Sequence, residues 1–244
     1  MNHVACIILA AGKGKRMKSD LPKVLHELHG RPLIAHVLDS CREAGIGRII
    51  VVVGFKGELV VKVMQPHTVE VVWQTEQLGT GHAVLQTEPL LSGHQGELIV
   101  MNGDVPRVRP RTMTALVEEH RRRRAAATIL TAEVGDPKGY GRILRTGDGL
   151  VDRVIEEADA GEQTRLIKEI NSGMFCFTPT YLFSALREVR NDNQQGEYYL
   201  PDVLTILRRH NYPVAAQKVE DPNEVWGVNS PEQLKQIERL TVRD

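Results

Sequence analysis

Glycines and basic residues are combined between Leu9 and Lys23, where the sequence reads LAAGKGKRMKSDLPK. Gly12 and Gly14 lack a Cβ atom, so the backbone can turn sharply there and bring its N–H groups close to an anion. Arg16 and Lys23 add positive charge to the same segment. We therefore predict a loop that binds a polyphosphate.

The spacing of these glycines differs from two widespread phosphate-binding motifs. The dinucleotide-binding pattern G-x-G-x-x-G needs a third glycine, which is missing here, and the P-loop pattern needs a Lys-Ser or Lys-Thr pair directly after a glycine, whereas no such pair follows a glycine in this segment. The spacing argues against a dinucleotide-binding fold and against a P-loop ATPase. A simple strand-to-helix turn with surface lysines is the plain alternative to an anion-binding loop.

A second glycine-containing loop lies between Trp73 and Ala83, where the sequence reads WQTEQLGTGHA. Gly79 and Gly81 flank Thr80 just before a helix-like run. Backbone N–H groups and a hydroxyl can therefore face a ligand at a helix N-terminus. We predict a second phosphate- or base-binding loop here, with a purely structural turn as the alternative.

The elements that must position these loops alternate between strand and helix in the first hundred residues. We predict strands at Val4–Leu9, Arg48–Val53, Val69–Trp73 and Leu98–Met101, and helices at Pro32–Ala44, Glu58–Met64 and Gly81–Leu90. Such βαβ order builds a parallel sheet, and open parallel sheets bind ligands beyond the carboxyl ends of their strands. The glycine loop after the first strand and Asp104 after the fourth should therefore meet at one crevice.

The second half of the chain is more mixed. We predict strands at Ala127–Glu133, Arg142–Leu144, Val151–Ile155 and Ile170–Phe177, helices at Tyr181–Val189 and Leu200–His210, and an amphipathic helix from Ser230. The whole pattern predicts an α/β fold, a Rossmann-like three-layer α/β/α sandwich with a mostly parallel, mixed sheet.

Composition limits the class of partner and the compartment. Lysine and arginine together number 31, as do aspartate and glutamate. Without a global basic field, we expect no nucleic-acid partner and no membrane binding. Cys6, Cys41 and Cys176 follow no disulfide or zinc spacing, which favours buried thiols in a reducing compartment. No 18-residue apolar stretch or signal-peptide pattern is present, so we expect a cytoplasmic protein.

Several segments carry a resemblance to one enzyme family. They are LAAGKGKRM with LPK, QLGTGHA, GDVP, GVN, GYGRI, EINSG and GEYYLPD, and together they span nearly the whole chain. The pattern resembles sugar-nucleotide pyrophosphorylases, and most closely the bacterial N-acetylglucosamine-1-phosphate uridyltransferases. The resemblance implies the nucleotide-diphospho-sugar transferase type of fold, with a nucleotidyltransferase (pyrophosphorylase) domain over residues 1–229 and a C-terminal helix over residues 230–244.

The activity that the resemblance implies is uridylyl transfer. UTP and N-acetylglucosamine 1-phosphate would give UDP-N-acetylglucosamine and pyrophosphate, with Mg²⁺ as the cofactor. Arg16 and Lys23 would be catalytic, and Asp104 and Asn229 would hold the metal, since Mg²⁺ needs few protein oxygens beside water and phosphate. From the residues alone, Asp104 could instead form a turn after its strand and Asn229 could cap the following helix.

The remaining binding residues also follow from the resemblance. Gln74 is expected at the base, because an amide offers the donor and the acceptor that a uracil edge requires. The sugar is expected to meet the backbone of Gly141 and the side chains of Glu156 and Asn171. The other predicted nucleotide- or substrate-binding residues are Leu9, Ala10, Ala11, Gly12, Gly14, Gln77, Gly79, Thr80, Asn102 and Gly103.

One segment departs from the family pattern. Where the family usually has Glu-His-Lys-Asp-Ala, this chain reads Glu156, Glu157, Ala158, Asp159, Ala160. A carboxylate replaces the histidine and the lysine is missing. The sugar preference around Glu156 is therefore open, and a solvated acidic stretch is the alternative reading of this segment.

Two other functions compete with the proposed one. A nucleotidyltransferase for another acceptor, such as methylerythritol phosphate with CTP, shares the first loop but lacks QLGTGHA and GEYY. A nucleotide-sugar sensor without turnover would be expected to lose Lys23, Asp104 or Asn229, and all three are present. Bifunctional family members continue into hexapeptide repeats, which this sequence lacks, so we expect uridylyl transfer without acetyl transfer. The sequence specifies no oligomeric state.

Overall fold

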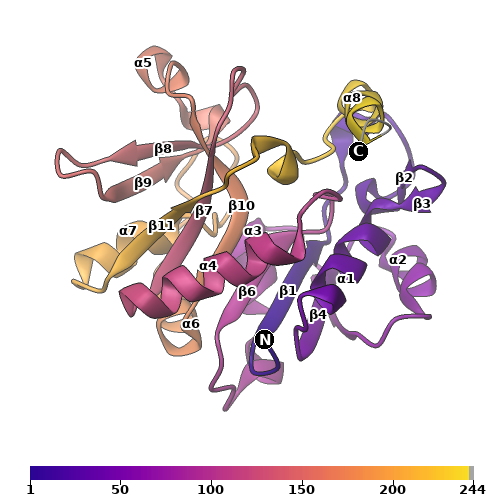
Figure 1. Cartoon of the computed structure of the whole chain (residues 1–244), viewed down its shortest axis with the longest axis horizontal. Helices are drawn as coiled ribbons and strands as arrows, with labels where there is room; N and C mark the ends of the chain where they lie inside the picture. Colours follow the sequence, from indigo (N-terminus) through magenta and orange to yellow (C-terminus); the bar gives the residue numbers. More distant parts are fainter. Residues whose placement is uncertain (242–244) are drawn as a thin grey trace.

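The computed structural model describes residues 1–241 and has a nine-stranded mixed sheet at its centre (Figure 1). The predicted residues 242–244 of the C-terminal helix lie outside the described part. The strands of the sheet are β1 (Ala5–Ala10), β4 (Arg48–Val53), β5 (Glu70–Trp73), β6 (Leu98–Asn102), β7 (Ala127–Glu133), β8 (Arg142–Arg145), β9 (Val151–Ile155), β10 (Glu169–Phe177) and β11 (Val214–Lys218), and a separate hairpin consists of β2 (Glu27–Leu28) and β3 (Arg31–Pro32).

Helices cover both faces of this sheet. The α-helices are α1 (Leu33–Glu43), α2 (Gly57–Met64), α3 (Thr80–Leu85), α4 (Pro110–Arg123), α5 (Glu162–Arg165), α6 (Pro179–Leu186), α7 (Asp202–Arg209) and α8 (Pro231–Thr241). One hydrophobic cluster joins α1, α2 and α4 to the sheet, and a second joins α3, α6 and α7 to it. The predicted three-layer α/β/α sandwich is confirmed.

The order of the strands explains how the layers form. The main path is β11-β7-β10-β6-β1-β4-β5, in which β10 runs antiparallel to both of its neighbours and the other pairs are parallel. Along β1, Cys6 and Ile8 belong to one hydrophobic cluster while Ala5 and Ile7 belong to the other. A strand that is apolar on both faces requires helices on both sides, as parallel sheets do generally.

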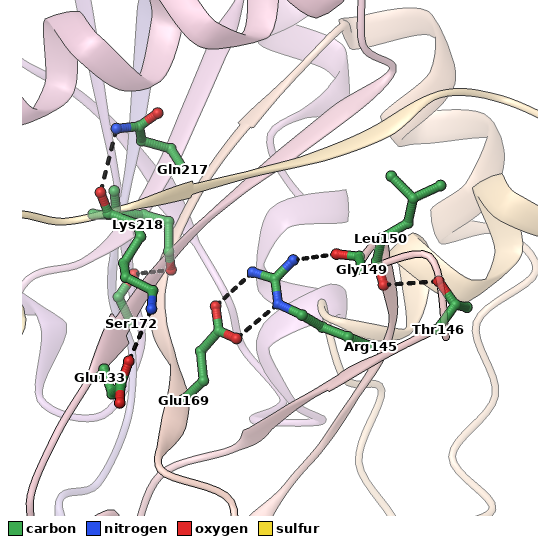
Figure 2. Close-up of polar contacts among 10 residues, drawn as sticks. Glu133, Arg145, Thr146, Gly149, Leu150, Glu169, Ser172, Gln217 and Lys218 are labelled. Atoms are coloured by element: carbon green, nitrogen blue, oxygen red, sulfur yellow. Dashed lines mark hydrogen bonds and ion pairs between the residues drawn. The ribbon is translucent and has the colours of Figure 1, made fainter.

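Polar side-chain contacts link neighbouring strands of the second half of the chain within the sheet (Figure 2). Arg145 of β8 and Glu169 of β10 form a two-point ion pair, with N–O distances of 2.8 and 2.6 Å. Lys218 of β11 pairs with Glu133 of β7 at 2.9 Å, and Ser172 of β10 donates to the Leu130 carbonyl at 2.7 Å. Strands that arrive from distant parts of the sequence are therefore held together beside the carboxyl end of β6.

The structure corrects two sequence predictions. The helix predicted over Gly81–Leu90 is α3 alone, followed by a separate 3₁₀ turn, η3 (Glu88–Leu91). Pro89 has no N–H to continue an α-helical ladder, and the Thr87 hydroxyl bonds the Val84 carbonyl at 2.7 Å. The edge strand β11 was not predicted, because its residues do not alternate between apolar and polar as a half-buried strand would.

Short 3₁₀ turns complete the described chain. Besides η3 they are η1 (Lys15–Met17), η2 (Lys23–Leu25), η4 (Glu157–Asp159) and η5 (Pro222–Val225). The first two place Arg16 and Lys23 at the carboxyl end of β1, and η4 lies between β9 and α5. Within residues 1–241, none of the helices has the length and apolar character needed to cross a membrane.

Candidate active site

Two adjoining cavities open at the carboxyl ends of β1 and β6. The larger one has a volume of about 570 Å³ and contains both predicted glycine loops in its wall. The smaller one, of about 290 Å³, is lined by residues of the second half of the chain. The residues that line both cavities are Leu9, Arg16, Lys23, Thr80, Asn102, Asp104, Gln195, Glu197 and Asn229.

A cluster of charged and amide groups lies where the two cavities meet. The Lys23 ammonium is ion-paired with the buried Asp104 carboxylate and donates to Asn229 Oδ1 at 3.0 Å. Arg16 Nη2 donates to the same oxygen at 2.8 Å. Residues from three remote parts of the chain thus converge, and Lys23, Asp104 and Asn229 open onto one shared space.

The oxygens of Asp104 and Asn229 are suited to a divalent cation. A single nitrogen, Lys23 Nζ, already contacts both of them, so one cation at that point can reach both. The Val228 N–H donates to the Asp104 carbonyl at 3.0 Å, which fixes the distance between the two ligand-bearing segments. One carboxylate and one amide oxygen match the hard ligands that Mg²⁺ uses beside water and phosphate. Among the described residues, no group of three or more His, Cys, Asp and Glu side chains is arranged to hold a metal.

The first glycine loop has the open geometry that a polyphosphate needs. Gly14 has a φ of +59°, and a Cβ built there would lie 2.8 Å from the Cβ of Lys23. A Cβ on Gly12 would meet nothing within 4 Å. Gly14 is therefore required by the turn itself, whereas Gly12 leaves free space on the cavity wall for a ligand.

The second glycine loop packs on a segment that comes from far along the chain. Gly81 N–H donates to the Tyr198 carbonyl at 2.7 Å, and the Thr80 hydroxyl accepts from the Leu200 N–H at 3.0 Å. Gly79 has a φ of +113°, and a Cβ there would lie 2.6 Å from the Tyr198 oxygen. The GTG sequence thus serves close backbone packing, while Gly79 and Thr80 also line the larger cavity.

The Gln74 amide is held by contacts inside the protein. Its Nε2 donates to the Gly79 carbonyl at 3.0 Å and lies 3.0 Å from His82 Nδ1. One amide hydrogen of Gln74 therefore has a partner inside the protein, and the amide also lies in the wall of the larger cavity. Its contact with a base stays a prediction.

Beyond the Arg16 and Lys23 that it shares with the larger cavity, the smaller cavity is lined by hydrogen-bonding groups that include Glu156 and Asn171. Asn171 lies just before a register shift in β10, and its Oδ1 accepts from the Gly173 N–H at 2.8 Å. Asn171 also donates to Glu156, whose carboxyl group is withdrawn from water at the cavity wall. The pKa of Glu156 is raised to about 7, mainly by burial, which exceeds the lowering by the Asn171 hydrogen bond, and in smaller part by the neighbouring carboxylates of Asp202 and Asp159.

The segment that departs from the family pattern is not a solvated acidic stretch. The Glu157 carboxylate lies 2.9 Å from the guanidinium of Arg142, whose side chain is only 2% exposed. Arg142 also donates to the Tyr140 carbonyl. The carboxylate that replaces the family's histidine therefore neutralises a buried cation next to Gly141, which lines the smaller cavity.

All predicted site residues belong to the described part of the chain, and of these only Gly103 lines neither cavity. Its N–H donates to the Leu9 carbonyl at 3.0 Å, and a Cβ there would lie 3.2 Å from both Ile8 and Val24. Its role is close packing of β6 on β1. The sequence prediction also missed Gln195, Glu197, Tyr140 and Tyr199 on the cavity walls, although the GEYYLPD segment that contains two of them was a visible signal.

The chain is similar in sequence to one family of known proteins. The family model described as "MobA-like NTP transferase domain" matches residues 6–203. The chain is 47% identical over 240 residues to the "Bifunctional protein GlmU" of Pelotomaculum thermopropionicum, covering 98% of this chain and 52% of that protein. It is 46% identical over 234 residues to the protein of the same name from Oceanobacillus iheyensis, covering 96% of this chain and 51% of that protein.

Solved structures give the same fold at low sequence identity. A crystal structure of a UDP-glucose pyrophosphorylase complexed with UDP-glucose aligns with a TM-score of 0.76 and 19% identity, covering 98% of each chain. The chain spans about half the length of the curated relatives that it matches.

Proposed function

The chain belongs to the MobA-like NTP transferase family, and from this premise we propose that it transfers a uridylyl group from UTP to N-acetylglucosamine 1-phosphate. The products are UDP-N-acetylglucosamine and pyrophosphate. The observation that carries the proposal is the junction of the two cavities at Lys23, Asp104 and Asn229. Two phosphate-bearing substrates can reach each other at that junction.

In this proposal the reaction is a single in-line displacement. An oxygen of the sugar 1-phosphate attacks the α-phosphorus of UTP, and the bond from that phosphorus to the oxygen of the leaving pyrophosphate breaks. The attacking oxygen is already an anion, so no general base is needed, and catalysis consists of alignment and charge neutralisation. His82 is not assigned as a general base, because its two ring nitrogens lie 3.0 and 3.1 Å from the side-chain amides of Gln74 and Gln86.

The residues of the junction have distinct roles in the proposal. Arg16, which is exposed at the mouth of the larger cavity, binds the triphosphate, and Lys23 lies between the two reacting phosphates. Asp104 and Asn229 would hold Mg²⁺, which when bound would neutralise phosphate charge. Backbone groups from Leu9 to Gly14 line the larger cavity and face the nucleotide.

The smaller cavity is proposed to receive the sugar. Its wall contains the Glu156 carboxyl, the Asn171 amide and the Gly141 backbone, which suit neutral hydroxyls and an acetamide. The first two residues after Glu156 differ from the family pattern, but the Arg142–Glu157 pair supports the same wall. N-acetylglucosamine 1-phosphate is therefore our first choice of acceptor. Because its three cysteines are buried and form no disulfide, the protein is proposed to act in the cytoplasm.

A pyrophosphate-release assay tests this function. UTP, CTP, dTTP and ATP are each combined with the 1-phosphates of N-acetylglucosamine, N-acetylgalactosamine and glucose, with Mg²⁺ present. We expect the highest kcat/KM for UTP with N-acetylglucosamine 1-phosphate. Turnover with a non-uridine nucleotide alone would contradict the base assignment, and binding without pyrophosphate release would favour a nucleotide-sugar sensor.

A further inference from the structure

The contacts of Asn229 fix its side chain and its backbone at the same time. Its Oδ1 accepts from Arg16 and Lys23, and its Nδ2 donates to the Gly227 carbonyl at 3.3 Å. Its backbone N–H donates to the side-chain Oε1 of Gln233 at 2.8 Å. The proposed metal ligand is therefore held from one side by Arg16 and Lys23 of the first glycine loop (the cationic loop, residues 9–23) and from the other by the first turn of α8.

Gln233 is itself held in place by the start of the helix. Its N–H donates to the Ser230 hydroxyl at 3.3 Å, and the Leu234 N–H donates to the Ser230 carbonyl at 3.1 Å. In an ordinary capping box, the residue in the Gln233 position returns its bond to the N–H of the cap. Here the returned bond goes one residue further back, to Asn229.

Helix α8 also rests on the cationic loop. Ile237 is buried in a small hydrophobic cluster with Met17, Leu28, Leu33 and Val228, and Leu234 packs against it. Figure 1 shows α8 next to the β2–β3 hairpin, which contains Leu28. Met17 directly follows Arg16, so the helix that holds Asn229 also supports the segment that donates to it.

We propose that Gln233 is a positioning residue for the metal site and that α8 thereby aligns Asn229 with Asp104. The inference rests on the proposed function, because it takes Asn229 as a metal ligand. The side-chain Oε1 of Gln233 fixes the Asn229 backbone, so the side-chain Oδ1 of Asn229 keeps one orientation toward the junction of the cavities. Outer groups that orient a metal ligand in this way typically change metal affinity by about 10 to 100-fold when they are removed.

The test compares three variants of the full chain. Gln233→Met keeps the length of the side chain but removes the acceptor, whereas Gln233→Glu keeps an acceptor oxygen. Gln236→Met makes the same change at an exposed position of the same helix. Amide hydrogen exchange at Asn229 is measured without metal, Mn²⁺ binding is measured by electron paramagnetic resonance, and the half-saturating Mg²⁺ concentration is measured in the pyrophosphate assay.

For Gln233→Met we expect Asn229 exchange to accelerate about tenfold, since one hydrogen bond is lost. Mn²⁺ binding should weaken, and the half-saturating Mg²⁺ concentration should rise, by about 10 to 100-fold. The KM for UTP at saturating Mg²⁺ should stay within about twofold, because the larger cavity is unchanged. Gln233→Glu should restore metal binding, and Gln236→Met should resemble the wild type in all three measurements.

Unchanged metal binding in Gln233→Met would overturn the inference, whether or not Asn229 exchange accelerates. A wild-type protein that binds no Mn²⁺ would also overturn it. A wild-type protein that binds Mn²⁺ but releases no pyrophosphate would instead refute the proposed function. Amide exchange at Asn229 and Mn²⁺ binding would then decide whether Gln233 positions the metal ligand. Equal weakening by Gln236→Met would assign the effect to helix stability and would likewise overturn the role of Gln233.

Discussion

The two cavities that meet at Lys23 share Arg16 and Asp104 and differ in the other residues of their walls. The wall of the larger one contains the exposed residues Gly12, Lys13 and Arg16 on a loop after β1. The part of the smaller one that is not shared contains the Glu156 carboxyl and the Asn171 amide. One cavity therefore adds an exposed basic loop to the shared junction, and the other adds hydrogen-bonding groups from the second half of the chain.

The contrast matches what each proposed substrate requires. A triphosphate carries several negative charges and keeps part of its hydration, so exposed cations and backbone N–H groups can bind it. A neutral sugar offers no charge, so it must be recognised by directed hydrogen bonds in a dry pocket. Burial raises the pKa of Glu156 in the smaller cavity to about 7, and burial also raises the pKa of Asp202, at the start of α7, to about 6.

The largest expected effect tests whether the junction depends on positive charge. Lys23→Ala removes the ammonium that contacts both Asp104 and Asn229, and we expect kcat for pyrophosphate release to fall on the order of 100 to 1000-fold. Lys62→Ala, an exposed lysine of α2, is the control and should keep wild-type activity. Near wild-type turnover of Lys23→Ala would remove Lys23 from the mechanism.

A smaller effect tests, through its pH dependence, whether Glu156 in the smaller cavity is buried. The pKa of Glu156 is raised from 4.5 to about 7, so the folded state binds its proton more tightly than the unfolded state does. The stabilisation by this proton is complete below pH 4.5 and is lost as the pH rises to about 7. Glu156→Gln does not titrate. As the pH rises through that window, the unfolding free energy of Glu156→Gln relative to that of the wild type should therefore increase by at most about 1.4 kcal/mol per pH unit.

Urea unfolding of both proteins between pH 4.5 and 8 measures this difference. Glu162→Gln, at an exposed position of α5, should give a curve parallel to that of the wild type. Parallel curves for Glu156→Gln as well would mean that the Glu156 carboxyl is as hydrated in the folded protein as in the unfolded chain. The proposed contrast between the two cavities would then be wrong.

The smallest effect separates two glycines of the cationic loop. Gly14→Ala places a Cβ at a φ of +59° and 2.8 Å from Lys23, so we expect a loss of about 1–2 kcal/mol in the free energy of unfolding. Gly12→Ala, where a Cβ meets nothing within 4 Å, should change this free energy by less than about 0.5 kcal/mol. Equal losses in urea unfolding would show that the two positions are not distinguished by the turn.

Much of the fold could be predicted from the sequence because its signals are local. Residues Ile49 to Val53 are buried and apolar, and β4 (Arg48–Val53) has the predicted bounds. The helix predicted over Pro32–Ala44 is α1 (Leu33–Glu43), and Gly45, with a φ of +71°, follows its end. Strand β11 escaped prediction because its place at the edge of the sheet is set by its pairing with β7, which is remote in sequence.

The candidate site divides in the same way. The sequence alone determined the two glycine loops, the cations beside the first one and the amphipathic final helix, because side-chain chemistry and periodicity within a few residues specify them. Only the tertiary structure decided that Glu157 neutralises Arg142, that Gly79 must be glycine because of Tyr198, and that Gln233 reaches Asn229. These contacts depend on how remote segments pack, and a carboxylate or a glycine in a sequence does not reveal which distant group will approach it.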